Sequence, residues 1–236
     1  MRRSILRLAA VASVTAGCAT IEKTPLEFPA VMDPARPEHH AGKVIFVELV
    51  TPDLEASKRF YGQLFGWTFR DVQSGATKYA EVSLDGQAVA GLFHRDLPSG
   101  KQRQPAWLTY ISVADVDVAA KTAADQRAKV LFEPHTIPNR GREAVFSDPQ
   151  GAVFAVLFSS SGDPPEALAA PGEWIWSTLM TTDPRTDAVF YQALFGYQVF
   201  DLPAVHPGAQ HLMLASDNYA RASANTLPAT GVDFHP

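Results

Sequence analysis

The chain has little of what a disulfide-stabilised or nucleic-acid-binding protein needs. It holds one cysteine, Cys18, in 236 residues, so no internal disulfide can form. Charged residues make up 19% of the chain, give a net charge of −5 and form no basic cluster. Because nucleic-acid binding needs a concentrated lysine and arginine face, no nucleic-acid partner is expected. No glycine-rich phosphate loop and no Ser/His/Asp set stands out, so neither site can be assigned.

An apolar run long enough to span a membrane is also missing near the N-terminus. The run Leu8–Ala16 covers about nine residues, too few to cross a hydrocarbon core of roughly 30 Å as a helix. Arginines at positions 2, 3 and 7 precede it, and Ala16, Gly17 and Cys18 end it. This layout predicts a signal peptide over residues 1–18.

The segment Thr15-Ala16-Gly17-Cys18 resembles a bacterial lipobox, in which the cysteine is lipidated and becomes the mature N-terminus. The resemblance implies lipidation of Cys18, export to the cell envelope and membrane contact through the lipid anchor, on the periplasmic side in a Gram-negative cell. Two alternatives stay open. Arg2-Arg3 also resembles a twin-arginine signal, so the export route is undecided, and Cys18 could be an unmodified thiol beside an ordinary cleavage site.

A proline-rich segment, residues 19–42, follows the cysteine. It has prolines at positions 25, 29, 34 and 37 and little apolar periodicity. Such a composition is typical of an extended linker, so it is predicted to tether the anchor to the folded body. His39 and His40 lie in this segment and are expected to be solvated rather than to bind a ligand.

A repeated segment organises the rest of the chain. Residues 47–66 return as residues 177–196, where Phe60, Tyr61, Leu64, Phe65 and Gly66 match Phe190, Tyr191, Leu194, Phe195 and Gly196. The β-branched stretch 44–50 predicts a strand, and Thr51-Pro52-Asp53 provides a cap and a first-turn proline for the following helix. Gly66 favours the end of that helix, and strands are predicted over 67–72, 78–84 and 87–94. The result is a βαβββ unit.

A weaker copy of the unit follows directly. It has a predicted strand over 107–113, a helix over 115–128, and strands near 129–133, 142–147 and 152–158. Residues 43–158 are therefore predicted to form one complete domain of two units, followed by a linker over 159–172. A third unit is expected from residue 173 to about 225, which makes 173–236 an incomplete second domain.

Paired βαβββ units with the segment Pro-Asp-Leu-Glu-Ala-Ser and a late Asp-Pro-Gln-Gly-Ala-Val-Phe-Ala turn resemble the vicinal-oxygen-chelate superfamily. The resemblance is to its tandem-domain bacterial members, loosely called glyoxalase or bleomycin-resistance proteins. It implies an α+β fold in which paired βαβββ modules form a curved, cup-shaped mixed sheet with flanking helices. It does not imply one activity, because the superfamily includes isomerases, dioxygenases, epimerases, thiol transferases and drug-binding proteins.

The resemblance also implies a divalent metal bound by His, Glu or Gln side chains on the first and last strand of each unit. In this sequence those positions fall on hydrocarbon side chains: Phe46, Ala90, Leu108, Ala155, Trp176 and, roughly, Ala222. None of these can donate nitrogen or oxygen to a metal. No metal and no other cofactor is therefore expected.

A few polar side chains remain for the cup. Alternation along the strand places Glu48 inward with Phe46, where it is interpreted as a general base, assisted by Tyr110 as a hydrogen-bond donor to the ligand. The alternatives are that Glu48 reaches solvent or pairs with Arg142, and that Tyr110 is core. Candidate ligand-binding residues are Phe46, Tyr79, His94, Leu108 and Arg142, and Trp107 and Trp176 would make the pocket aromatic. Arg140 and Arg142 either bind an anion or lie in a solvent-exposed hairpin, and both alternatives stay open.

Three hypotheses follow from these residues. The first is an envelope-anchored protein that binds a small hydrophobic or aromatic molecule without metal. The second is an enzyme: a metal-independent isomerase or lyase that uses Glu48. A metal-dependent glyoxalase or dioxygenase is the less favoured enzyme hypothesis. The third is an interaction scaffold, because half a cup leaves an open sheet edge that a homodimer could complete.

Overall fold

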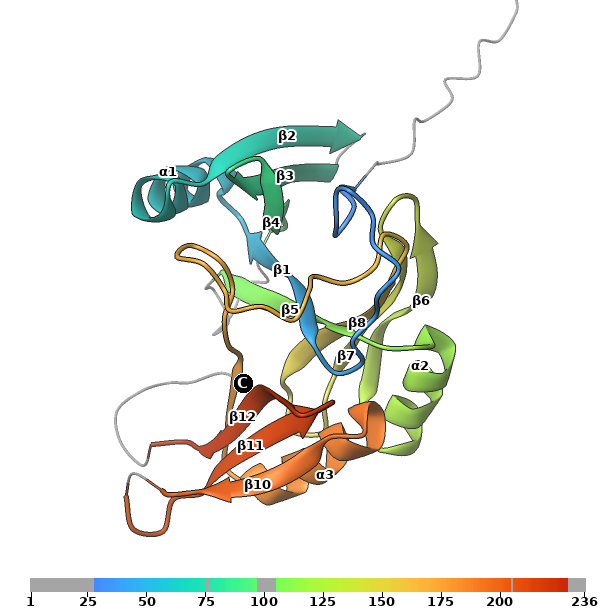
Figure 1. Cartoon of the computed structure of the whole chain (residues 1–236), viewed down its shortest axis with the longest axis vertical. Coiled ribbons are helices and arrows are strands. Elements are labelled where there is room, and N and C mark those ends of the chain that lie inside the picture. The colour runs from blue at the N-terminus through green and yellow to red at the C-terminus, as the bar shows by residue number, and fades with distance from the viewer. Residues whose placement is uncertain (1–27, 75–76, 97–104, 205, 229–236) are drawn as a thin grey trace, which may run out of the picture.

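The computed structural model describes residues 28–74, 77–96, 105–204 and 206–228. The predicted signal peptide and Cys18 lie outside these residues. The described part forms an eight-stranded sheet and a four-stranded sheet, with two helices packed between them and a third at the far end of the larger sheet (Figure 1). No helix among the described residues is long and apolar enough to cross a membrane.

The first unit consists of β1 (Val44–Thr51), α1 (Leu54–Phe65), β2 (Thr68–Ser74), β3 (Thr77–Leu84) and β4 (Gln87–His94). The Asp53 side chain caps α1 by accepting a hydrogen bond from the Ala56 N–H. The helix ends at Gly66, as predicted, and this glycine adopts the left-handed conformation with a φ of 73°.

The second unit consists of β5 (Ala106–Ser112), α2 (Val116–Asp125), β6 (Lys129–Ile137), β7 (Gly141–Ser147) and β8 (Val153–Ser159). Asp115 caps α2 and accepts hydrogen bonds from the Asp117 and Val118 N–H groups. The helix ends three residues before the predicted position 128, and β6 continues to Ile137, beyond the predicted 133.

The third unit repeats the same element order with β9 (Thr178–Thr181), α3 (Pro184–Phe195), β10 (Gln198–Leu202), β11 (His211–Ser216) and β12 (Tyr219–Thr226). Its sheet has the order β10-β11-β12-β9, so β9 lies at an edge. The equivalent strand of the first unit, β1, lies instead in the middle of its sheet.

The first two units join through β1 and β5, which pair antiparallel at the centre of the eight-stranded sheet. The order β2-β3-β4-β1-β5-β8-β7-β6 places one unit on each side of that pair. Phe46 lies opposite Tyr110, and Glu48 lies opposite Leu108, so these four side chains share one face. The predicted α+β fold with a curved mixed sheet is confirmed.

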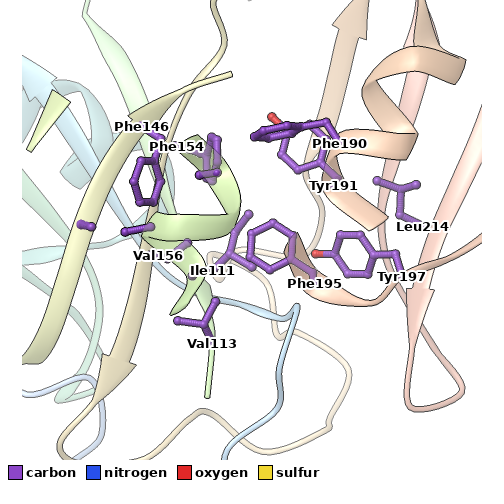
Figure 2. Close-up of a cluster of buried hydrophobic side chains, with 14 of the residues drawn as sticks. Ile111, Val113, Phe146, Phe154, Val156, Phe190, Tyr191, Phe195, Tyr197 and Leu214 are labelled. Atoms are coloured by element: carbon purple, nitrogen blue, oxygen red, sulfur yellow. The ribbon is translucent and has the colours of Figure 1, made fainter. Parts of the chain in front are cut away.

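The main apolar core lies on the other face of this sheet, where α2 and α3 pack side by side (Figures 1 and 2). Phe154 of β8 contacts the rings of Phe190, Tyr191 and Phe195 of α3, with ring centroids 5.5 to 6.3 Å apart. These aromatic contacts fix the third unit against the second.

Residues 28–42 are part of the folded body, so the prediction that 19–42 is a tether is wrong for this portion. We call residues 28–40 the strap, which runs along the inner side of the eight-stranded sheet (Figure 1). The Met32 N–H donates to Ser161 Oγ at 2.9 Å, and the Arg36 N–H donates to the Ser161 carbonyl at 2.8 Å. Val31 is buried in an apolar cluster with residues of β1, β5, β7 and β8.

The two histidines of the strap also contact the body. The ring of His39 stacks on Phe158 with centroids 4.5 Å apart, and the His40 N–H donates to Asp163 Oδ2 at 2.6 Å. Apolar residues in the strap are too few to show periodicity, which is why its packing could not be predicted from the sequence.

Candidate functional site

Glu48 lies at the centre of the inner face, where β1 and β5 meet. Its side chain is buried, and both carboxylate oxygens accept hydrogen bonds from tyrosines, one on β3 and one on β5. The Tyr79 hydroxyl donates to Oε1 at 3.0 Å, and the Tyr110 hydroxyl donates to Oε2 at 2.7 Å. The inward orientation predicted for Glu48 agrees with this geometry, whereas its hydrogen bonds with Tyr79 and Tyr110 were not predicted.

Arg140 provides the positive charge that compensates Glu48. It lies in the hairpin between β6 and β7, and its side chain is only 1% exposed. Its Nη2 is 3.4 Å from Glu48 Oε1 and donates to the Tyr79 hydroxyl at 3.2 Å, while its Nε donates to the Pro29 carbonyl at 2.9 Å. The guanidinium also lies 4.1 Å from the ring centre of Phe46. The carboxylate is therefore paired in the buried site.

Both tyrosine hydroxyls donate to Glu48, and the Tyr79 hydroxyl also accepts a hydrogen bond from Arg140. Burial, followed by the negative charge of Glu48, raises the pKa of both Tyr79 and Tyr110 well above the usual value for tyrosine. Both hydroxyls therefore stay protonated at any physiological pH. With each oxygen of Glu48 engaged, this cluster holds the carboxylate as an acceptor rather than leaving it available to a substrate.

Glu143 of β7 is a second inner-face carboxyl that the sequence reasoning missed. It is 6% exposed, and burial, followed by the charge of Glu48, raises its pKa to about 7, although Arg140 lowers it. Its Oε1 lies 3.7 Å from Nε2 of His135 on β6. Glu143 therefore changes protonation near neutral pH.

Gly91 of β4, rather than Ala90, occupies the last-strand metal position of the first unit. Gly91 pairs with Glu48 as Ala155 pairs with Tyr110, whereas Ala90 belongs to the cluster on the opposite face. A Cβ on Gly91 would lie 2.0 Å from the Tyr79 hydroxyl oxygen. Tyr79 can therefore reach Glu48 only because residue 91 has no side chain.

The residues at the implied metal positions do not fit a divalent metal. In the first two units they are Phe46, Gly91, Leu108 and Ala155. In the third unit the last-strand position falls on Ser223 rather than Ala222, because Ser223 pairs with β9 as Gly91 pairs with β1. Among the described residues, no group of three or more His, Cys, Asp or Glu side chains could hold a metal ion. The nearest carboxylate, Glu48, is already paired with Arg140.

The remaining predicted ligand-binding residues do not all face the cup. Leu108 packs against the inner apolar cluster. His94 pairs with Thr51, one residue out of phase with Gly91 and Phe93, so it faces the helix side instead. Arg142 pairs with the exposed Asp117, with Nε to Oδ2 and Nη2 to Oδ1 distances of 2.7 Å, and not with Glu48. The arginine that enters the cup is Arg140.

A second feature, which we call the aromatic hollow, lies along β9 and has a volume of about 440 Å³. It is lined by residues of all three units, including three of the four tryptophans: Trp107, Trp174, Trp176, Phe154, Tyr191, Tyr197, Thr109, Ser177, Thr178 and Ser223. Trp107 and Trp176, which were expected in the cup, lie here instead. On β5, Trp107 points away from Leu108 and Tyr110 and toward the hollow.

The indole N–H groups around the hollow are already paired. Trp174 donates to Ser177 Oγ at 3.2 Å, Trp176 donates to Ser223 Oγ at 3.1 Å, and Trp107 donates to the Tyr61 hydroxyl at 3.2 Å. Trp107 and Trp174 lie with ring centroids 5.8 Å apart. The hollow therefore offers apolar ring faces, with small hydroxyls as its polar groups.

Comparisons with known proteins agree with this fold. Residues 39–156 match the Glyoxalase/Bleomycin resistance protein/Dioxygenase superfamily. The chain is 32% identical over 204 residues to a Mycobacterium tuberculosis protein named "Putative glyoxylase CFP32", covering 86% of this chain and 78% of that protein. It is 34% identical over 167 residues to the anthracycline biosynthesis protein DnrV of Streptomyces peucetius, covering 66% of this chain and 61% of DnrV.

Two solved structures share the fold at low sequence identity. The Mn(II)-bound glyoxalase from Novosphingobium aromaticivorans aligns with a TM-score of 0.56 and 19% identity, over 80% of this chain and 62% of that one. A mutant of 4-hydroxymandelate synthase from Streptomyces coelicolor aligns with a TM-score of 0.56 and 13% identity, over 79% and 62%. This chain thus spans about three fifths of both solved structures and of DnrV. By its sequence match and its fold, it belongs to the glyoxalase/bleomycin resistance protein/dioxygenase superfamily.

Proposed function

We propose that this protein binds a small, flat aromatic molecule in the aromatic hollow, without a metal and without transforming it. The observation that carries the proposal is the hollow itself, of about 440 Å³, lined by three tryptophans. This volume lies within the usual range of small-molecule sites. Because the indole N–H groups already have partners, the available recognition is stacking and apolar contact, which suits a planar ring system.

The cup favours binding over turnover. The alternative of an isomerase or lyase that uses Glu48 is less well supported. Both oxygens of that carboxylate are engaged by tyrosines, and the strap covers it.

The test is a titration of the full chain with 2-naphthol, followed by calorimetry and tryptophan fluorescence. We expect saturable binding of one equivalent, weakened at least tenfold by Trp174→Ala, since a lost aromatic anchor costs about 1.4 kcal/mol or more. Trp67→Phe is the matched control, because Trp67 packs beneath α1 outside the lining and should leave the affinity unchanged. Equal affinity in the wild type and Trp174→Ala would exclude the hollow as the site.

The second candidate function is an interaction scaffold, favoured by the open edge of β9. In the first domain the equivalent strand, β1, pairs antiparallel with β5, whereas β9 pairs with β12 alone among the described residues. A second copy of the chain that adds a strand here would form a homodimer. Native mass spectrometry separates the two functions: a monomer at micromolar concentration that binds 2-naphthol supports the first, and a dimer that excludes it supports the second.

We further propose that the protein is exported and anchored to the envelope through a lipid on Cys18. This rests on the arginines, the apolar run and the lipobox-like residues before Cys18. Metabolic labelling with a radioactive fatty acid should label the wild type and not Cys18→Ser. Equal labelling of both chains, or labelling of neither, would contradict the anchor.

A further inference from the structure

The strap places ligand-like groups inside the cup. The Phe28 ring packs edge-on against Tyr79, with centroids 4.9 Å apart, and lies 5.8 Å from the Arg140 guanidinium carbon. The next residue, Pro29, presents its carbonyl to Arg140 Nε at 2.9 Å. An aromatic ring followed by a neutral carbonyl oxygen therefore occupies the centre of the inner face.

The cup has donor capacity that the strap does not use. Arg140 Nη1 is buried and has no hydrogen-bond partner among the described residues, while Nε and Nη2 are both engaged. A buried guanidinium N–H without a partner carries a desolvation cost that a ligand oxygen would remove. The unpaired group lies beside the ring of Phe46, where an apolar ligand body would also find contact.

Charge restricts the chemistry of that oxygen. Glu48 and Glu143 already place two carboxyls around the single guanidinium of Arg140. A ligand carboxylate would add a third acidic group and be repelled, whereas a ketone or amide oxygen would not. The Pro29 carbonyl, a neutral amide oxygen, fits this rule.

The strap is held mainly by backbone contacts near Ser161, and few of its side chains are buried. Two of its N–H groups bind Ser161, and Gly162 lets the backbone approach so closely that a Cβ there would lie 2.0 Å from the Arg36 carbonyl. Only Pro29 and Val31 of residues 28–40 are buried. Displacement of residues 28–32 would thus open the cup while Arg36, whose N–H donates to the Ser161 carbonyl, keeps the rest of the strap in place.

We propose that the cup is a second binding site, separate from the aromatic hollow, for an uncharged aromatic ketone or amide. Residues 28–32 of the strap occupy it as a built-in substitute for that ligand. Ligand and strap compete for Arg140, so the affinity of the free ligand is reduced by the fraction of time that the strap is docked.

Benzamide is the probe, and benzoate at pH 8 is its charged counterpart of the same shape. The doubly substituted Phe28→Ala/Val31→Ala chain should bind benzamide at least tenfold more tightly than the wild type, and Arg36→Ala, with its exposed side chain, should match the wild type. Arg140→Lys in the doubly substituted chain should lose at least tenfold in affinity. Equal benzamide affinity with and without the strap substitutions, or benzoate binding as strong as benzamide binding, would overturn the proposal.

A measurement on the unaltered chain keeps the test decisive if the strap variant does not fold. Saturating benzamide should speed amide hydrogen exchange of Met32 at least fivefold, because its N–H loses Ser161 Oγ when the strap leaves. Unchanged exchange at Met32 at saturating benzamide would overturn the competition between strap and ligand.

Discussion

Replacing Arg140 by methionine should strongly destabilise the fold. Arg140 is the cation paired with Glu48, and both side chains are almost fully buried, at 1% and 5% exposure. Methionine keeps the unbranched apolar stem but carries no charge, so the change removes the ion pair. The Glu48 carboxylate would remain buried with two tyrosine hydroxyls and no counter-charge.

The expected loss is about 3–5 kcal/mol in the free energy of unfolding, the usual cost of breaking one side of a buried pair. Removing both charges should cost less than removing one, because no unpaired ion is left. Glu48→Gln/Arg140→Met should therefore recover at least about 2 kcal/mol relative to Arg140→Met alone. The amide oxygen of glutamine can still accept a hydrogen bond from one tyrosine, and its NH2 group can donate to the hydroxyl oxygen of the other.

Equilibrium unfolding in urea measures these differences through the transition midpoint. Arg142→Met is the matched control, since Arg142 lies two residues away and pairs only with exposed Asp117. Its midpoint should equal that of the wild type. A loss below about 1 kcal/mol for Arg140→Met, or a double variant less stable than Arg140→Met, would refute the assignment of Arg140 as the essential counter-charge.

Three further predictions concern Glu143, Gly91 and the repeated helix. Burial raises the pKa of Glu143 from 4.5 to about 7, so the folded state binds the proton more tightly and the free energy of unfolding falls as pH rises from 4.5 to 7. Glu143→Gln should reduce this difference in stability between pH 5 and pH 8 in urea melts, and an unchanged difference would contradict the raised pKa. Gly91→Ala should displace Tyr79 and lower the melting temperature by an amount equivalent to about 1–3 kcal/mol, whereas an unshifted melting temperature would contradict the contact. Phe195→Ala should cost about 3–5 kcal/mol and Phe65→Ala much less, because these matched residues are 7% and 41% exposed; equal losses in chemical denaturation would show that α1 and α3 are equally buried.

The repeat made most of the fold predictable. The segment that ends at Gly66 and returns at Gly196 carries its own cap, apolar face and helix end, so local signals and the long-range pattern agree. Alternation along β1 correctly placed Glu48 on the inner face. The register of β4 was predicted one residue off, because Gly91, and not Ala90, pairs with Glu48.

The partner of Glu48 could not be predicted by such rules. Arg140 and Arg142 flank Gly141 in a tight hairpin, where Asn139 and Gly141 have φ angles of 64° and 124°. Which arginine turns into the cup depends on this local bend and not on a periodic pattern. The aromatic hollow is equally invisible to a strand-by-strand reading, since its lining comes from segments as distant as Val44 and Ser223.

Metal analysis of the purified chain, combined with a 2-naphthol titration, tests the central claim most directly. The claim is that hydrocarbon and glycine at the inherited metal positions have replaced a metal centre by binding that needs none. We predict much less than one equivalent of zinc, nickel, iron or manganese per chain, and the same 2-naphthol affinity with added EDTA or added Mn²⁺. One tightly held equivalent of metal, or loss of 2-naphthol binding in EDTA, would contradict the account.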